Sequence, residues 1–288
     1  MVIKMKLGVC LSGGGIKGVA HIGVLKALEE SNIKIDCISG TSSGSIVATL
    51  YAAGYSCEEM LEIFNKYSKK IKYIDFSNIF NILKKLIIEH KFIIEGFNSG
   101  KIIEDSMNCI CADKKIYKIK DIKKDLIIAS VSLNSGKVYF FESNKKENRY
   151  SDDLIYIDDI NIGKAVRASC SFPGVFCPVH LDNDILIDGG LRENIPWKEI
   201  KKRNIDSILC VVFEEKNKVK KNKNIIDSIS GSISLLGREL ANYELKGADF
   251  ILKIKTEEIS LLDFSKLNYL YKLGYIETKK FLKNIKIK

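Results

Sequence analysis

Ser42 has the sequence surroundings of a nucleophile. It lies at the centre of GTSSG, which fits the pattern G-x-S-x-G between a predicted strand at 34–39 and a predicted helix of mainly small residues at 45–53. In this pattern a sharp turn between strand and helix holds the serine hydroxyl clear of the backbone, and Gly40 and Gly44 supply small neighbours. The pattern predicts that Ser42 attacks a carbonyl carbon. The alternative is a Ser/Gly turn that only packs against a helix.

A serine nucleophile needs a base, and the histidines of this chain are poorly placed for that role. The chain has three of them, His21, His90 and His180. In α/β-hydrolases the histidine follows the acid late in the chain, but no histidine follows His180. The order of residues therefore does not support an α/β-hydrolase triad.

Asp188 is the candidate base. It ends the apolar strand sequence DILI and is followed by Gly189 and Gly190, which let the backbone approach another segment closely. A carboxylate can replace imidazole when it lies against the serine and partial burial raises its pKa. We predict that Asp188 accepts the proton of Ser42. An ordinary Asp-Gly turn is the alternative.

A glycine-rich loop separates the first predicted strand from the first predicted helix. Gly13, Gly14 and Gly15 begin the loop and Gly18 ends it. Backbone amides in such a loop, close to a helix N-terminus and without Cβ atoms in the way, can face an anion. The loop is therefore a candidate for stabilising negative charge.

The same loop also fits the dinucleotide fingerprint G-x-G-x-x-G. A dinucleotide site needs an acidic residue about 20 positions later, at the carboxyl end of the second strand, to hold the ribose. Asp36 is the acid available, but it lies at the beginning of that strand, and Ser42 follows the far end. Nucleotide binding is therefore disfavoured. It would show itself as a thermal shift with a dinucleotide and no esterase activity.

Strand and helix patterns alternate along the chain, as in a parallel α/β sheet. Pro is rare and no Gly/Ser linker is present, so we expect one domain over residues 1–288. Its motif-bearing core is at about 6–213, and residues 225–288 complete it. The predicted strands are 6–12, 34–39, 126–131, 138–141, 184–187, 207–213 and 248–254, and the predicted helices are 19–31, 45–53, 57–70, 163–169, 225–245 and 266–282, with further helices between 71 and 125.

The net charge of +10 comes from 46 Lys and Arg against 36 Asp and Glu, and five of the basic residues are Arg. Lysine lacks the planar fork that suits base edges and bidentate phosphate contacts, and no nucleic-acid-binding motif accompanies it. We therefore expect no nucleic-acid partner. Attraction to anionic lipid surfaces draws on the same charge and stays open.

The eight cysteines include no C-x-x-C pair, and no histidine lies near the one close pair, Cys109 and Cys111. Zinc-ligand spacing is therefore missing, and we expect free thiols in a reducing cytoplasm. Lys4 and Lys6 interrupt the apolar residues at the N-terminus, so no signal peptide is expected.

GGGIKG, GTSSG and DGG, in this order, resemble the three motifs of the patatin-like phospholipases. The likeness continues in AHIGVLKALEE after the first motif, RASCSFPGVFCPV before the third and RENIPW after it. It spans residues 6–213 well and the remainder loosely, with 71–125 the least specific. The third motif is DGG where many members have DGA, and both place a small residue beside the acid.

The resemblance implies a three-layer α/β/α sandwich with a mainly parallel sheet, and an acyl hydrolase with a Ser-Asp dyad and neither metal nor cofactor. Carried over by residue, Ser42 is the nucleophile, Asp188 is the base, and the amides around Gly13, Gly14 and Gly15 form the oxyanion hole. Lys17 fills the basic position of the loop, and the residues that support the motifs are Gly18, Gly40, Gly44, Gly189 and Gly190.

The activity implied is cleavage of lipid carboxylic esters, of the phospholipase A or lysophospholipase type, through an acyl-enzyme. A general carboxylesterase or thioesterase on the same dyad is an alternative that chain-length preference would distinguish, and a catalytically silent lipid-binding relative is another. Residues 79–97 carry an apolar helical face beside lysines, which suits contact with lipid, although packing over the core is equally compatible. We expect a cytoplasmic protein, with peripheral contact to an anionic membrane left open.

Overall fold

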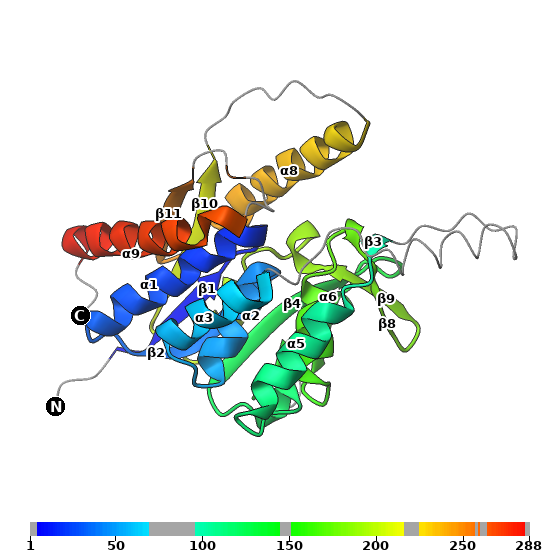
Figure 1. Ribbon diagram of the computed structural model, residues 1–288, viewed down its shortest axis with the longest axis horizontal. Coiled ribbons are helices and arrows are strands. Elements are labelled where there is room, and N and C mark those ends of the chain that lie inside the picture. The colour runs from blue at the N-terminus through cyan, green and yellow to red at the C-terminus, as the bar shows by residue number, and fades with distance from the viewer. Residues whose placement is uncertain are drawn as a thin grey trace, which may run out of the picture.

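Nine strands form the central sheet in the part of the chain that the structure describes (Figure 1). The structure is a computed structural model, and it describes residues 5–68, 96–144, 151–215, 225–256, 259 and 264–285. The strands of this sheet are β1 (Leu7–Leu11), β2 (Ile35–Thr41), β4 (Asp125–Ser132), β5 (Val138–Glu142), β6 (Leu154–Ile157), β8 (Val179–Leu181), β9 (Asp184–Asp188), β10 (Ser207–Glu215) and β11 (Phe250–Thr256). A separate pair joins β3 (Gly96–Asn98) to β7 (Gly174–Phe176).

The central sheet is mainly parallel, as predicted. Its main path runs β11-β10-β1-β2-β4-β5-β6. All neighbours from β11 to β4 are parallel, as are β5 and β6, whereas β5 and β9 each pair antiparallel with β4. Because β1 and β2 are adjacent and parallel, the loops that follow them meet at one edge of the sheet.

Helices cover both faces of the sheet, and the alternation of side chains along a strand shows why. On β1, Val9 and Leu11 pack into one core cluster, and Cys10 between them packs into a second cluster on the opposite face. The first cluster is covered by α1 (Val19–Glu30), α2 (Ser43–Ala52), α3 (Cys57–Ser68), α5 (Lys101–Ala112), α6 (Ile162–Ser169) and α9 (Leu267–Asn284), and the second by α7 (Trp197–Lys201) and the residue after α8 (Ile225–Glu244). The predicted three-layer sandwich is confirmed.

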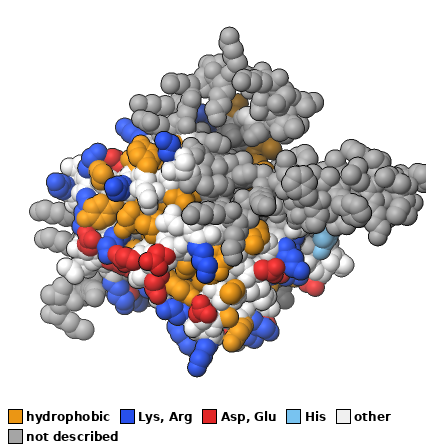
Figure 2. Space-filling view, viewed as in Figure 1, with side chains coloured by type: hydrophobic (Ala, Val, Ile, Leu, Met, Phe, Trp, Pro, Cys, Tyr) orange, Lys and Arg blue, Asp and Glu red, His pale blue; other side chains and the backbone are white. Residues whose placement is uncertain are grey.

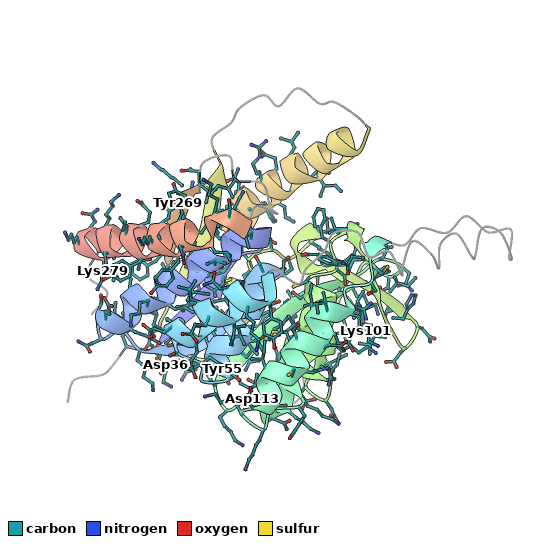
Figure 3. All side chains as sticks on the ribbon, in the orientation of Figure 1. Asp36, Tyr55, Lys101, Asp113, Tyr269 and Lys279 are labelled. Carbon is teal, nitrogen blue, oxygen red and sulfur yellow. The ribbon has the colours of Figure 1, made fainter. Side chains whose placement is uncertain are left out.

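The C-terminal helix α9 lies along α1 (Figure 1), and two glycines bring the helices together. A Cβ atom at Gly23 would touch the backbone oxygen of Tyr271, and one at Gly274 would touch the backbone oxygen of Ala20. Lys279, which Figure 3 labels beside α1, also forms an ion pair of 3.5 Å with the last residue of α1. In contrast, α8 extends away from the sheet in Figure 1, and its last residue, Glu244, is buried.

The predicted strands and helices in the described ranges are present, but the sequence analysis missed several short strands. These are β3, β6, β7 and β8, which have three or four residues each, too few to show a clear alternation. The predicted lipid-contacting segment lies outside the described residues except at its end, and so does the Lys-rich segment 216–224. On the face drawn in Figure 2, Lys and Arg side chains are dispersed among Asp and Glu.

Candidate active site

Ser42 occupies the turn between β2 and α2. Its backbone has φ 53° and ψ −128°, a conformation that is strained for a residue with a side chain. Close packing around the turn explains the flanking glycines, because a Cβ at Gly40 would touch the oxygen of Gly44, and one at Gly44 would touch that of Leu11. The strand, turn and helix predicted around Ser42 are therefore all present.

The last residue of α6, Ser169, forms a hydrogen bond with the backbone of Ser42. The Ser42 amide donates a hydrogen bond of 2.9 Å to the Ser169 hydroxyl oxygen. The Ser169 hydroxyl in turn donates one of 2.6 Å to the carbonyl oxygen of Ala129 on β4. Sequence analysis did not single out Ser169, which lies in the segment RASCSF before the third motif. Its only sequence signal was a polar residue at the end of an amphipathic helix.

Asp188 reaches Ser42 because β9 follows β2 along the same side of β4. β2 pairs with β4 from Asp125 to Ala129, and β9 then pairs antiparallel from Ser130 to Ser132, with Asp188 opposite Ser130. The C-terminal ends of β2 and β9 therefore meet beside β4, because the pairing of β2 stops at Ala129 and that of β9 stops at the next residue, Ser130. This geometry places the last residue of β9 against the turn after β2.

The Ser42 side chain lies close enough to the Asp188 carboxylate for hydrogen bonding to lower the pKa of that carboxylate. Asp188 is 2% exposed, and its burial raises its pKa to about 6, against the lowering effect of hydrogen bonds from the Ser42 hydroxyl and the Gly190 amide. The Gly190 amide donates at 2.8 Å. The carboxylate is therefore ionised at neutral pH and more basic than an exposed aspartate.

Glycine 189 lets this carboxylate approach the turn. A Cβ atom on Gly189 would lie 2.5 Å from the Ala129 oxygen and 2.9 Å from a methyl carbon of Thr41. The space beside Asp188 is therefore filled by β2 and β4, which accounts for the small residue that the third motif carries at this position. The structure therefore places the Asp188 carboxylate beside Ser42.

The glycine loop lies against the same turn. A Cβ atom at Gly13 would be 3.0 Å from Cβ of Ser42, and one at Gly18 would be 2.6 Å from Cβ of Ser43. The Gly13 amide is already engaged, because it donates a hydrogen bond of 2.9 Å to Oδ1 of Asn194. Among the described residues the amides of Gly14 and Gly15 donate no hydrogen bond.

Lys17 lies in the short 3-10 turn from Gly15 to Gly18. Its side chain is buried at 2% exposure, which is unusual for lysine. The basic residue of the first motif is therefore packed inside the protein beside the site, where it can contribute to the shape and charge of the loop.

The histidines do not supply a base in the described structure. His21 is fully buried on α1, where Nε2 lies 2.8 Å from the Ser12 carbonyl oxygen, and burial lowers its pKa to about 4. His180 is exposed on β8, and His90 lies outside the described residues. The carboxylate of Asp188, and no described imidazole, contacts the serine.

Comparison with known proteins agrees with this geometry. The family model of the patatin-like phospholipases matches residues 9–200, which include both the serine turn and Asp188. The chain belongs to the patatin-like phospholipase family. Lysophospholipase NTE1 of Candida albicans is 29% identical over 205 residues, which are 71% of this chain and 13% of the fungal protein. The patatin-like chain thus spans a small part of that relative's length.

Other relatives extend the comparison to bacteria and to solved folds. The uncharacterized protein YqhO of Bacillus subtilis is 27% identical over 219 residues, covering 74% of the patatin-like chain and 73% of YqhO. VipD from Legionella pneumophila matches with a TM-score of 0.53 and 14% identity, covering 98% of this chain and 67% of that one. Human GIVD cytosolic phospholipase A2 bound to methyl gamma-linolenyl fluorophosphonate matches with a TM-score of 0.50 and 11% identity, covering 97% and 58%. These two likenesses show the fold.

Asp36, the acid considered for a dinucleotide site, lies away from the glycine loop. Asp36 is the second residue of β2, at the edge opposite Ser42, where its carboxylate accepts a hydrogen bond of 3.1 Å from the Leu7 amide and pairs with Lys34 at 3.2 Å. Figure 3 labels Asp36. The glycine loop therefore faces a serine and not a ribose-binding carboxylate.

Three further properties concern the described ranges of the patatin-like chain. No three His, Cys, Asp or Glu side chains gather there in a way that could hold a metal ion. No helix in those ranges is both long enough and apolar enough to cross a membrane. All eight cysteines are free, and Cys109 is exposed.

Proposed function

We propose that this patatin-like protein is a lipid acyl hydrolase of the phospholipase A or lysophospholipase type, with Ser42 as nucleophile and Asp188 as base. The hydrogen bond between the Ser42 hydroxyl and the buried carboxylate of Asp188 carries the proposal. A serine in a strained turn, paired with a base whose pKa is close to neutral, is the arrangement that acyl transfer needs. The fungal relatives named lysophospholipase support the substrate class.

The proposed reaction has two steps. In the first, Asp188 accepts the hydroxyl proton as the Ser42 oxygen attacks the ester carbonyl, and the tetrahedral intermediate collapses to an acyl-enzyme with loss of the alcohol, which takes up that proton. In the second, Asp188 accepts a proton from water as the water oxygen attacks the acyl-enzyme. The fatty acid leaves and the proton returns to the Ser42 oxygen.

The glycine loop supplies the oxyanion hole in this proposal. We assign the donors to the amides of Gly14 and Gly15, because Gly13 already donates to Asn194. A well-placed donor of this kind contributes about 3–4 kcal/mol to the transition state. Lys17, buried in the same loop, adds positive charge to this region. Gly18, Gly40, Gly44, Gly189 and Gly190 permit the close contacts between the loop, the turn and Asp188.

In this proposal the ester substrate is a lipid in a membrane. We infer that the net positive charge of the protein brings it into peripheral contact with anionic membranes. Co-sedimentation with vesicles of anionic and of zwitterionic phospholipid tests this. Salt-sensitive binding to the anionic vesicles is the expected result. Equal or absent binding to both would remove the membrane contact but leave the dyad proposal intact.

A fluorophosphonate probe tests the dyad directly. The wild-type protein is expected to become labelled at Ser42, as located by peptide mass mapping, and to release fatty acid from phospholipid or lysophospholipid. Ser42→Ala and Asp188→Asn are each expected to abolish both labelling and hydrolysis while circular dichroism remains native. Hydrolysis of short-chain esters or thioesters, but not of lipids, would support the carboxylesterase or thioesterase alternative.

Matched variants control for nonspecific effects in this experiment. Ser43→Ala removes a buried hydroxyl that has no hydrogen-bond partner among the described residues, one residue from the proposed nucleophile. Asp182→Asn changes an exposed acid in the turn before β9, where φ is 51° and asparagine is well tolerated. Both are expected to retain labelling at Ser42. A labelled Ser42→Ala variant would exclude that serine as the nucleophile.

A further inference from the structure

Glu193 and Asn194, which follow the third motif, form hydrogen bonds with three separate segments. The carbonyl oxygen of Glu193 accepts a hydrogen bond of 2.9 Å from the Thr41 hydroxyl, one residue before the nucleophile. Oδ1 of Asn194 accepts one of 2.9 Å from the Gly13 amide. The Asn194 amide donates one of 2.9 Å to the carboxylate of Glu244, the last residue of α8. The nucleophile strand, the glycine loop and α8 therefore all bond to this dipeptide.

Two backbone amides at the start of the glycine loop donate hydrogen bonds to other segments. On one side the loop is fixed by the Ser12 amide, which donates to the Val211 oxygen of β10 at 3.1 Å. The next amide, that of Gly13, is fixed by Asn194. Both amides are therefore used to hold the backbone, and the two that follow remain available to a ligand. Glycine has no side chain to limit its backbone, so an external partner must supply this restraint.

Asn194 is itself held firmly. Its backbone amide bonds to Glu244, and the neighbouring Trp197 donates its indole N–H to the carbonyl oxygen of the same glutamate at 2.7 Å. Trp197 is 4% exposed and Glu244 is 6% exposed. The backbone that carries the half-buried Asn194 side chain is thus held by contacts with a buried glutamate.

We propose that Asn194 is a positioning residue that orients the oxyanion loop through its hydrogen bond to Gly13. The inference rests on the proposed function, because it concerns the transition state of ester cleavage. Asn194 does not touch the substrate in this proposal. It fixes the peptide plane that precedes the Gly14 and Gly15 amides, so that these donors are aligned before the oxyanion forms.

The side-chain amide fits this task better than a carboxylate. Both groups offer an oxygen that can accept from Gly13, but a carboxylate adds negative charge beside a loop that must stabilise a developing negative charge. A Cβ atom at Gly190 would lie 3.4 Å from Oδ1 of Asn194 and 3.1 Å from Oδ1 of Asp188. A second carboxylate would therefore also lie near the first.

Steady-state kinetics of the full chain on a soluble ester tests the proposal with two variants. Asn194→Ala removes the acceptor and is expected to lower kcat by about 10- to 100-fold with KM within about threefold, since only the transition state contains the oxyanion. Asn194→Asp keeps an acceptor and adds charge, so it is expected to lower kcat by about tenfold with KM unchanged. The second variant keeps the test decisive if the first does not fold.

Two binding probes separate positioning from a general structural role. A trifluoromethyl ketone forms a hemiketal oxyanion on the serine, and its affinity is expected to fall with kcat in both variants. An ether analogue of the substrate has no oxyanion, and its affinity is expected to stay unchanged. Hydrogen exchange at the Gly13 amide is expected to become faster in Asn194→Ala and to stay slow in Asn194→Asp.

Asn108→Ala is the matched control, because Oδ1 of Asn108 on α5 also accepts a hydrogen bond of 2.9 Å from a glycine amide, that of Gly163 on α6. Its kcat is expected to stay within about threefold of wild type. An unchanged kcat in both Asn194 variants, an equal loss for the ether analogue, or an equal loss of kcat in Asn108→Ala would each overturn the inference. A wild-type protein without labelling or hydrolysis would instead overturn the proposed function, and this inference with it.

Discussion

At the scale of single residues, the environment of Asp188 decides whether a carboxylate can act as the base for a serine. Burial raises its pKa, whereas the hydrogen bonds from the Ser42 hydroxyl and the Gly190 amide lower it, and the result is a pKa of about 6. A more exposed aspartate would be too weak a base, and an unpaired buried one would stay protonated at neutral pH. The balance of these effects suits proton transfer near pH 7.

The pKa of Asp188 predicts the pH dependence of hydrolysis. Below about pH 6 the carboxylate becomes protonated and cannot accept the serine proton, so kcat/KM is expected to fall about tenfold per pH unit. The measurement uses a soluble short-chain ester between pH 4.5 and 8, with circular dichroism at each pH to exclude unfolding. A rate that stays constant down to pH 5 would contradict Asp188 as the base.

The backbone strain at Ser42 makes a second prediction. At φ 53° and ψ −128° glycine is favoured over residues with a Cβ atom. Ser42→Gly is therefore expected to be more stable than Ser42→Ala by about 1 kcal/mol, measured by urea unfolding. Both variants lose the hydroxyl and its hydrogen bond to Asp188, so their difference reports the backbone. Equal stability of the two would argue against strain at this turn.

At the scale of elements, the direction of β9 matters most for the site. The sequence predicts a strand that ends in Asp188, but it gives no direction relative to the sheet. In the structure β9 runs antiparallel to β4 and occupies the side of β4 that β2 has left. Because the strands meet end to end, Ser42 and Asp188 lie beside each other although they are 146 positions apart in the chain.

The contact between α1 and α9 gives a prediction at this scale. Gly274→Ala places a methyl group against the backbone oxygen of Ala20, so the helices must separate. The variant is expected to lose about 1–3 kcal/mol of unfolding free energy. The control is Gly237→Ala on α8, whose added Cβ atom would meet no atom of the described residues within 4 Å. This variant is expected to gain about 0.5–1 kcal/mol from helix propensity. Urea unfolding of both variants measures the contrast, and an unaffected Gly274→Ala protein would contradict the close packing.

At the scale of the whole molecule, buried acids connect folding to pH. Burial and repulsion from Glu193 raise the pKa of Glu244 to about 8, against hydrogen bonds from the backbone of Asn194 and Ile195 and the charge of Lys198. The folded protein therefore binds a proton that the unfolded chain, with an ordinary value of 4.5, releases.

This difference predicts that stability decreases as pH rises. At Glu244 the folded state holds more protons than the unfolded state between about pH 4.5 and 8, so this residue lowers the free energy of unfolding through that window. The lowered pKa of His21 opposes the fall below about pH 6.5. Glu244→Gln is expected to flatten the fall between pH 7 and 8, whereas part of it persists below pH 7 because burial also raises the pKa of Glu193, to about 7. Urea unfolding from pH 5 to 8.5 measures both slopes, and identical slopes would contradict a raised pKa at Glu244.

We also propose that residues 1–288 fold as one domain. The contacts of α9 with α1 and of Glu244 with Asn194 join the C-terminal part to the motif-bearing core. The same contacts explain why the C-terminal elements could be predicted as strands and helices but not placed. Their periodicity is a local property of the sequence. Their position depends on contacts with distant segments, made at Gly23, Gly274 and Glu244.

The sequence by itself determined the local structure around the chemistry. Glycines at fixed spacing around Ser42 and after Asp188 indicate tight turns at these two residues. The strand and helix patterns beside them depend on neighbouring residues alone. The tertiary structure alone decided that the Gly13 amide is engaged by Asn194, that Ser169 holds the Ser42 backbone, and that Asp188 is buried enough to have a pKa of about 6. Each of these depends on contacts between segments distant in the chain, and hydrogen bonding and desolvation are properties of that three-dimensional packing.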